Sequence, residues 1–139
     1  MTNDTAGRDQ TSVLIVDDQA LLRSTMRDLL QEAFPDFDFL DVGDGASALS
    51  ACDAYRPVLV LMDKCLPDVD GIELTAVLIE RYPAMQVIVI SYRSGEAYAQ
   101  RAREVGACAF LCKDKLASEL VPAVAAALRA AGQTAGGAS

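Results

Sequence analysis

Short apolar runs recur along the chain and predict β-strands. Three of these runs are continuous and rich in β-branched residues, and they cover residues 13–16, 58–62 and 87–90. Such runs are typical of strands that are covered on both faces, as in the middle of a parallel sheet. Two weaker segments, 37–42 with carboxylates inside it and the short run 109–112, are predicted as edge strands.

Helical patterns fill the gaps between these runs. The clearest covers residues 20–34, where several apolar side chains fall on one helical face. These side chains are Leu22, Met26, Leu29, Leu30 and Ala33. The last helix is predicted to end at Ala131, and its inward residues are Leu120, Val121, Val124 and Leu128. It begins at Leu116 or Ser118, and Pro122 favours the later start because proline fits the first turn of a helix.

Capping residues predict where two other helices start. Asp44 can cap a helix over residues 45–54. Asp70, with Glu73 three positions later, resembles a capping box for a helix that ends near Tyr82. Both helices therefore have a start signal that the sequence alone supplies.

Ser94 and Gly106 are expected to start and stop a further helix, so that five strand–helix units follow one another. Right-handed crossovers between parallel strands place helices on both faces of the sheet. Five units are too few for a closed eight-stranded barrel, and the central and edge strands match the flavodoxin-like order 2-1-3-4-5. The sequence therefore predicts an α/β three-layer sandwich around a five-stranded parallel sheet.

The chain has the length and composition of one globular domain. Its 139 residues are 52% hydrophobic and 23% charged, close to the average of such domains. We expect one domain over residues 12–131, a flexible tail over 1–11, and a flexible tail or truncated linker over 132–139. No apolar run approaches the roughly 20 residues of a membrane helix. The N-terminal residues do not resemble a signal peptide, so a cytoplasmic location is expected.

Charge and residue counts exclude several functions. The 12 Lys and Arg residues stand against 20 Asp and Glu residues, and the net charge of -8 has the wrong sign for direct contact with nucleic acid. The absence of histidine removes Ser/His and Cys/His catalysis, histidine metal sites and a phosphohistidine role. The four cysteines lack CxxC spacing, so we expect reduced and mostly buried thiols.

The polar residues that follow the predicted strands form the candidate site. They are Asp17, Asp18, Asp63, Ser91 and Lys113. Because the carboxyl ends of parallel strands lie at one edge of the sheet, these side chains are expected to converge there. Clustered carboxylates repel one another unless a cation is present, and an all-oxygen set favours Mg²⁺ (or Mn²⁺). A lone aspartate at a strand end is more often a turn or cap residue, but this combination favours phosphoryl transfer to or near a carboxylate.

Four segments of the chain read VLIVDDQALLRSTMRDLL, VLVLMDKCLPDVDGIEL, VIVISYRS and GACAFLCKD. Together they resemble the CheY-like receiver domain of two-component response regulators, and the resemblance covers about residues 12–130. It implies that Asp63 accepts a phosphoryl group from a histidine kinase, a phosphotransfer protein or a small phosphodonor. Such a domain is not an enzyme beyond catalysing its own phosphorylation and dephosphorylation. Asp114 after Lys113 makes the chain similar to the receivers of LuxR/NarL-type regulators.

The resemblance also implies which residues hold the metal ion and the phosphoryl group. Asp18 would bind Mg²⁺ directly and Asp17 through water, together with Asp63. The backbone carbonyl of Cys65 would be a further ligand. Lys113 would pair with the phosphoryl group.

Ser91 and Phe110 match the switch positions of the family. The Ser91 hydroxyl would move toward the phosphoryl group while the ring of Phe110 turns inward, although plain core packing is an alternative for Phe110. The next residue, Tyr92, departs from the small residue that is usual there, and its ring could partly cover the site. Arg93 and Cys65 also border the phosphoryl group, and Cys65 is a candidate for oxidation.

Three rival functions share parts of this pattern. A flavodoxin that binds FMN has the predicted fold, but Asp17 and Asp18 would repel the FMN phosphate. A phosphatase of the haloacid dehalogenase type has a second aspartate where this chain has Cys65. A receiver-like interaction module that works without phosphorylation stays open, with Tyr92 as its supporting feature.

The last two helices are a candidate contact surface for a homodimer or an effector. The first of them is locally basic, with Arg93, Arg101 and Arg103, and the Ala-rich last helix offers a flat face for close contact. A solvated face with ordinary helix propensity is the alternative.

Overall fold

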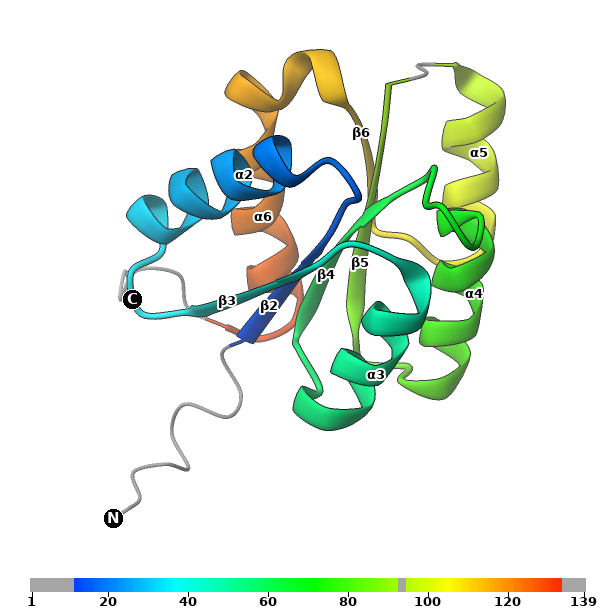
Figure 1. Ribbon diagram of the computed structural model, residues 1–139, viewed down its shortest axis with the longest axis horizontal. Helices are drawn as coiled ribbons and strands as arrows, with labels where there is room; N and C mark the ends of the chain where they lie inside the picture. Colours follow the sequence, from blue (N-terminus) through cyan, green and yellow to red (C-terminus); the bar gives the residue numbers. More distant parts are fainter. Residues whose placement is uncertain (1–11, 93–94, 134–139) are drawn as a thin grey trace.

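The computed structural model describes residues 12–92 and 95–133, which contain a parallel β-sheet (Figure 1). The order of its strands is β3-β2-β4-β5-β6, which confirms the predicted order 2-1-3-4-5. The strands are β2 (Ser12–Val16), β3 (Asp38–Val42), β4 (Leu59–Asp63), β5 (Gln86–Ser91) and β6 (Ala109–Cys112). The two weaker segments of the sequence are therefore the edge strands, as expected.

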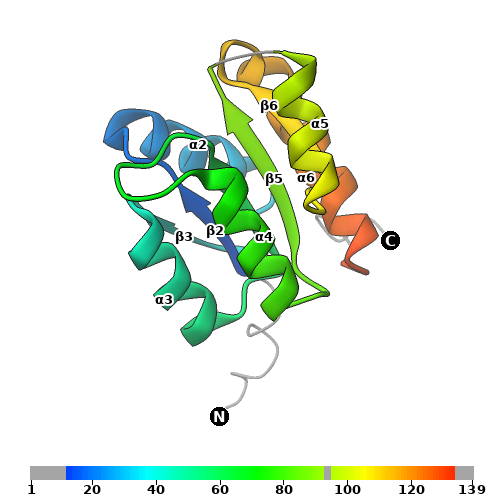
Figure 2. The same ribbon diagram turned by 90° about the vertical axis from the view of Figure 1, so that its right-hand side faces the viewer.

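Helices cover both faces of this sheet, which confirms the three-layer sandwich (Figures 1 and 2). The helices are α2 (Ala20–Ala33), α3 (Gly45–Tyr55), α4 (Gly71–Arg81), α5 (Glu96–Glu104) and α6 (Leu116–Ala130). Helices α2 and α6 lie on one face, whereas α3, α4 and α5 lie on the other. A short 3₁₀ helix, η1 (Lys113–Lys115), joins β6 to α6.

Alternation along the central strands divides the core into two apolar layers. In β2, Val13 and Ile15 pack with α2 and α6, whereas Leu14 and Val16 pack on the opposite face. Each of these four side chains is at most 1% exposed. A strand buried on both faces has no polar side to present to water, which is why its sequence is continuously apolar.

Several predicted helix ends are confirmed. The Asp44 carboxylate accepts a hydrogen bond from Ser47 N at 2.7 Å, and Asp70 accepts one from Ile72 N at the same distance. Gly106 follows α5 with a φ of +107°, a left-handed value that glycine adopts without strain.

The structure corrects the predicted start of α6. The helix begins at Leu116 rather than Ser118, and Pro122 lies inside it. Pro122 is exposed, so water can solvate the carbonyl group that its missing N–H leaves free. Leu116 and Leu120 are buried and hold the first turns against the sheet.

Three smaller details also differ from the prediction. Gly95, not Ser94, is the N-cap of α5, and Ser94 lies outside the described residues. Ala33 is exposed, and Phe34 is buried one position later. Gly132 adopts a φ of +84° at the end of α6, where Gln133 N bonds Leu128 O at 2.8 Å. Residues 132 and 133, the first two of the predicted C-terminal tail, thus close the helix. The rest of that tail (134–139) and the predicted N-terminal tail (1–11) lie outside the described residues.

In the part of the chain that the structure describes, no helix is both long and apolar enough to cross a membrane.

Candidate phosphoryl-acceptor site

The predicted site residues meet at the carboxyl edge of the sheet, where a hollow of about 370 Å³ opens. Asp17 follows β2, Asp63 and Ser91 end β4 and β5, and Lys113 follows β6. The residues that line the hollow are Asp18, Gln19, Asp63, Cys65, Ser91, Tyr92 and Lys113. The parallel sheet brings these residues together although they are far apart in the sequence.

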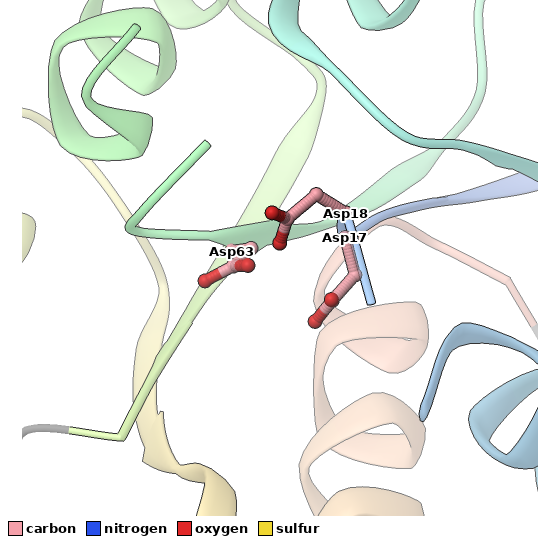
Figure 3. A group of neighbouring side chains, drawn as sticks. All are labelled: Asp17, Asp18 and Asp63. Carbon is pink, nitrogen blue, oxygen red and sulfur yellow. The ribbon is translucent and has the colours of Figure 1, made fainter. Parts of the chain in front are cut away.

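Three carboxylates gather at this edge, at the ends of β2 and β4 (Figure 3). Asp17, Asp18 and Asp63 each offer one oxygen, and these oxygens lie within 4.8 Å of one another. Asp17 and Asp63 are buried, whereas Asp18 is exposed. The backbone N–H of Gln19 donates to Asp17 Oδ1 at 2.7 Å, and that of Cys65 donates to Asp63 Oδ1 at 3.1 Å. Two of the three carboxylates are thus oriented by the chain that follows them.

Among the residues that the structure describes, Lys113 supplies the cation of the site and is buried beside the carboxylates. Its Nζ atom lies 2.9 Å from Asp17 Oδ2 and 3.2 Å from Asp63 Oδ2. It also donates a hydrogen bond to Gln19 Oε1 at 2.9 Å. Burial lowers the pKa of Lys113, but Asp17 and Asp63 outweigh this effect and raise the pKa above its ordinary value. Lys113 is therefore charged at neutral pH.

The pKa of Asp63 is raised, first by burial and then by the nearby charge of Asp17. The N–H of Cys65 and the ammonium of Lys113 lower it by a smaller amount. One ammonium therefore does not compensate the carboxylates, and a further cation would stabilise the ionised cluster.

The donor set fits Mg²⁺. The side chains that could bind a metal ion all offer oxygens. Asp17 Oδ2 is buried and accepts no hydrogen bond, although it forms an ion pair with Lys113. Hard divalent cations prefer such oxygens, and Mg²⁺ commonly keeps several waters while it binds one or two carboxylates. The exposed carboxylate of Asp18 leaves the side toward solvent open for those waters.

The loop between β4 and α4 holds the backbone of Asp63 in place. Gly71 N donates to Lys64 O at 2.6 Å, and Cys65 pairs with Asp70 in an isolated β-bridge. Asp68 in the same loop accepts hydrogen bonds from the first backbone N–H groups of α3, including Gly45 N at 2.8 Å. These bonds lower the pKa of Asp68 and tie the loop to a neighbouring helix.

The remaining predicted residues border the site. Ser91 is buried, and Tyr92 is 56% exposed. The Tyr92 ring covers one side of Lys113, with Nζ 4.8 Å from the ring centroid. Phe110 lies on β6, the strand next to β5. Its side chain is partly buried against the apolar layer between the sheet and helices α3, α4 and α5. Arg93 lies outside the described residues.

The prediction of mostly buried cysteines is wrong for this chain. All four are free thiols, but Cys65 and Cys108 are exposed and Cys112 is partly exposed. Cys52 is buried between α3 and the sheet, and burial raises its pKa to about 12. The exposed cysteines lie in connections or at the edge strand, where small apolar residues need not face the core.

Sequence reasoning missed two residues of the site. Gln19 contacts Lys113, and the only sequence signal for this contact was its position directly after Asp17 and Asp18. Gly71 packs directly against the backbone of Asp63. The sequence signal for this contact was a glycine at the first position of a well-capped helix, because glycine weakens helix formation and needs another reason to be there.

Comparison with known proteins identifies the family of the chain. Residues 13–125 match the response regulator receiver domain family, and the chain belongs to this family. The family places it in two-component signal transduction. Receiver domains bind Mg²⁺ in an acidic pocket and interact with histidine kinases, and in this chain Asp17, Asp18 and Asp63 form an acidic cluster.

Curated relatives of the chain are longer than it is. It is 33% identical over 123 residues to the transcriptional regulatory protein DegU of Brevibacillus brevis, covering 88% of this chain and 52% of DegU. It is 37% identical over 114 residues to the DNA-binding transcriptional activator DevR/DosR of Mycobacterium tuberculosis, covering 81% of this chain and 52% of that protein. The chain thus spans about half the length of these relatives.

Solved structures of LuxR/NarL-type regulators share the fold. The signal receiver domain of the putative response regulator NarL from Mycobacterium tuberculosis has a TM-score of 0.76 and 30% identity, covering 88% of this chain and 97% of that one. A LuxR family response regulator from Aurantimonas has a TM-score of 0.76 and 27% identity, covering 90% of this chain and 88% of that one. These similarities confirm the CheY-like receiver fold.

Proposed function

We propose that this chain accepts a phosphoryl group on Asp63 and relays the modification as a change of conformation. One observation carries the proposal. The Asp63 carboxylate lies 3.2 Å from Lys113 Nζ and within 4.8 Å of the Asp17 and Asp18 carboxylates, at the rim of a hollow open to a donor. This arrangement combines a nucleophile, a fixed cation and a place for a metal ion.

The reaction is a direct phosphoryl transfer. A carboxylate oxygen of Asp63 forms a bond to phosphorus while the bond from phosphorus to the donor breaks, and the leaving group keeps the electron pair. The donor is a phosphohistidine of a kinase or phosphotransfer protein, or a small molecule such as acetyl phosphate. Because the transition state of such transfers is loose, the site contributes positioning and electrostatic stabilisation. Lys113 donates to an oxygen of the phosphoryl group as negative charge shifts there.

Asp17, Asp18 and Asp63, with the backbone carbonyl of Cys65, are the residues that would hold Mg²⁺ or Mn²⁺. When bound, the ion neutralises charge on the phosphoryl oxygens and on the clustered carboxylates. The backbone N–H of Gln19 donates to Asp17 Oδ1 and fixes the orientation of this carboxylate. The chain would thus catalyse only its own phosphorylation and dephosphorylation.

The readout would pass through Ser91 and Phe110. They lie on the neighbouring strands β5 and β6, where Ser91 pairs with Cys112 and Val89 pairs with Phe110. A shift of the Ser91 hydroxyl toward the phosphoryl group would change the space beside the partly buried Phe110 ring. Phosphorylation would then shift the population between two packings of this region.

The partners would be a histidine kinase or phosphotransfer protein, and either an effector or a second copy of the chain. The receiver would span residues 12–131, and control of an output domain in the same protein is the alternative to control of a separate effector. The exposed face of α5 and α6 would carry the contact. The charge of the chain argues against direct contact with nucleic acid.

Intact mass spectrometry tests the proposal. Incubation with acetyl phosphate and Mg²⁺ is expected to add the mass of one phosphoryl group to the wild-type chain. The Asp63→Asn variant and a wild-type sample without metal are expected to stay unmodified. Equal modification of Asp63→Asn would contradict the assignment of the acceptor.

A further inference from the structure

Gln19 breaks the usual rule for the position that it occupies. It is the N-cap residue of α2, where serine, threonine, aspartate or asparagine normally accepts a backbone hydrogen bond. Its side chain makes no such bond. Instead it reaches across the site to Lys113, 94 positions away in the sequence, and Oε1 accepts a hydrogen bond from Nζ at 2.9 Å. A side chain that gives up its local bond for a distant one indicates a role in the site.

The ammonium group of Lys113 is surrounded by partners: Gln19 Oε1 and Asp63 Oδ2 accept hydrogen bonds from it, and Asp17 Oδ2 forms an ion pair with it outside hydrogen-bonding geometry. A lysine carries three N–H bonds. Oxygens of Asp17, Asp63 and Gln19 lie 2.9, 3.2 and 2.9 Å from Nζ, and the Tyr92 ring covers a further side at 4.8 Å. A phosphoryl oxygen that approaches Lys113 therefore competes with these oxygens for the ammonium group.

Gln19 is the partner that costs least to release. Asp17 is only 1% exposed, so loss of its contact with Lys113 would leave a buried carboxylate whose negative charge is less well compensated. Asp63 is the acceptor itself and stays next to the phosphoryl group that it receives. The Gln19 side chain is uncharged and the residue is exposed, so water can satisfy its amide after release.

We propose that Gln19 is a positioning residue that competes with the phosphoryl group for Lys113 and so weakens the hold of the site on that group. The inference rests on the proposed function of Asp63. It explains why the amide faces Lys113 rather than the N-terminus of α2. Removal of the Gln19 amide is therefore expected to strengthen, not weaken, the binding of a phosphoryl mimic.

Titration calorimetry with beryllofluoride at saturating Mg²⁺ tests this on the full chain. The variants are Gln19→Ala, which removes the amide, and Gln19→Asn, which is too short to keep the same bond but suits the N-cap position. Both are expected to lower the dissociation constant of beryllofluoride about three- to tenfold, the change that corresponds to the net contribution of one ordinary intramolecular hydrogen bond. The matched control Gln31→Ala removes a glutamine whose amide bonds Phe37 O outside the hollow, and should leave the constant unchanged.

The outcomes separate this inference from the proposed function. Binding by the wild-type chain with a lower dissociation constant in both Gln19 variants supports the competition. An equal or higher constant in either variant overturns it, because a residue that only orders the site would weaken binding when removed. Failure of the wild-type chain to bind beryllofluoride in Mg²⁺ would overturn the proposed function, and the inference with it. Urea unfolding of each variant checks that α2 remains folded.

Discussion

Gly71 lies so close to Asp63 that a Cβ atom on residue 71 would be 2.1 Å from the carbonyl oxygen of Asp63. The same atom would be 2.9 Å from the Cα atom of Lys64. These are backbone atoms, which cannot rotate out of the way as a side chain can. The first residue of α4 therefore sets where the backbone leaves β4, and with it the position of the Asp63 carboxylate.

Replacement of Gly71 by alanine is expected to damage both stability and the site. The added methyl group forces a backbone shift, and overpacking of this kind costs roughly 1–3 kcal/mol. Urea denaturation measures this loss, and the rate of labelling by acetyl phosphate should fall because Asp63 moves. Gly95→Ala is the control, since a Cβ there would come no closer than 3.9 Å to Tyr98. Equal stability and labelling of Gly71→Ala and Gly95→Ala would contradict this account.

Tyr92 is expected to restrict access to the site from solvent. Its ring is half exposed and lies over Lys113 Nζ at 4.8 Å, where a cation–π contact contributes about 0.5–1 kcal/mol. Tyr92→Ala should therefore speed labelling by acetyl phosphate about threefold, the rate equivalent of such a contact. Tyr92→Phe retains the ring and should behave like the wild type. A rate in Tyr92→Ala that is no higher than in Tyr92→Phe would show that the ring does not gate the site.

Asp70 is expected to make the stability of the chain depend on pH. Burial raises the pKa of Asp70, but Ile72 N and then Lys64, whose Nζ lies 3.2 Å from Oδ2, outweigh burial and lower the pKa. A carboxyl whose pKa is lowered by folding adds stability above its unfolded pKa of about 3.9 and loses it as pH falls through the folded value.

Asp70→Asn tests this directly, because asparagine keeps the helix cap but removes the charge. The variant should lose about 0.5–1 kcal/mol of unfolding free energy at pH 7, as expected for a partly exposed ion pair. Urea denaturation at several pH values should show the difference from wild type shrinking below about pH 4. A difference that is the same at pH 7 and pH 3 would mean that the charge plays no part.

Arg101 is expected to take part in contacts made by α5 and α6. It is exposed on α5, and only Ala102 of that helix is buried, so most of the helix is available to a partner. If phosphorylated chains associate through this face, Arg101→Glu should weaken their association about fivefold, the factor that corresponds to an exposed charge pair worth about 1 kcal/mol. Analytical ultracentrifugation with beryllofluoride measures this, with Asp63→Asn as the inactive control. Unchanged association would leave the basic residues as part of a solvated face.

Much of the site could be predicted because a parallel sheet places the end of every strand at one edge. The continuous apolar run of β4 ends abruptly at Asp63, and that of β5 ends at Ser91. These abrupt changes from apolar to polar residues mark the edge without knowledge of any side-chain position. The convergence of Asp63, Ser91 and Lys113 follows from topology alone.

Other features depend on details that a sequence pattern does not contain. The contact between Gln19 and Lys113 depends on the direction of one flexible side chain. The start of α6 depends on whether Pro122 faces solvent or the core, and hydrophobic periodicity alone did not decide this. The exposure of Cys65 depends on the path of a loop that is held by Asp70 and Gly71. Such features follow from three-dimensional packing rather than from residue type.

Reductive trapping tests the central claim most directly. An aspartyl phosphate is reduced by borohydride to homoserine, so peptide mapping after reduction locates the phosphorylated residue. The account predicts homoserine at position 63 in the wild-type chain after acetyl phosphate and Mg²⁺, and none when the metal is left out. Trapping at Asp17 or Asp18 instead, or no trapping even with a cognate kinase as donor, would contradict the account and favour an interaction module that works without phosphorylation.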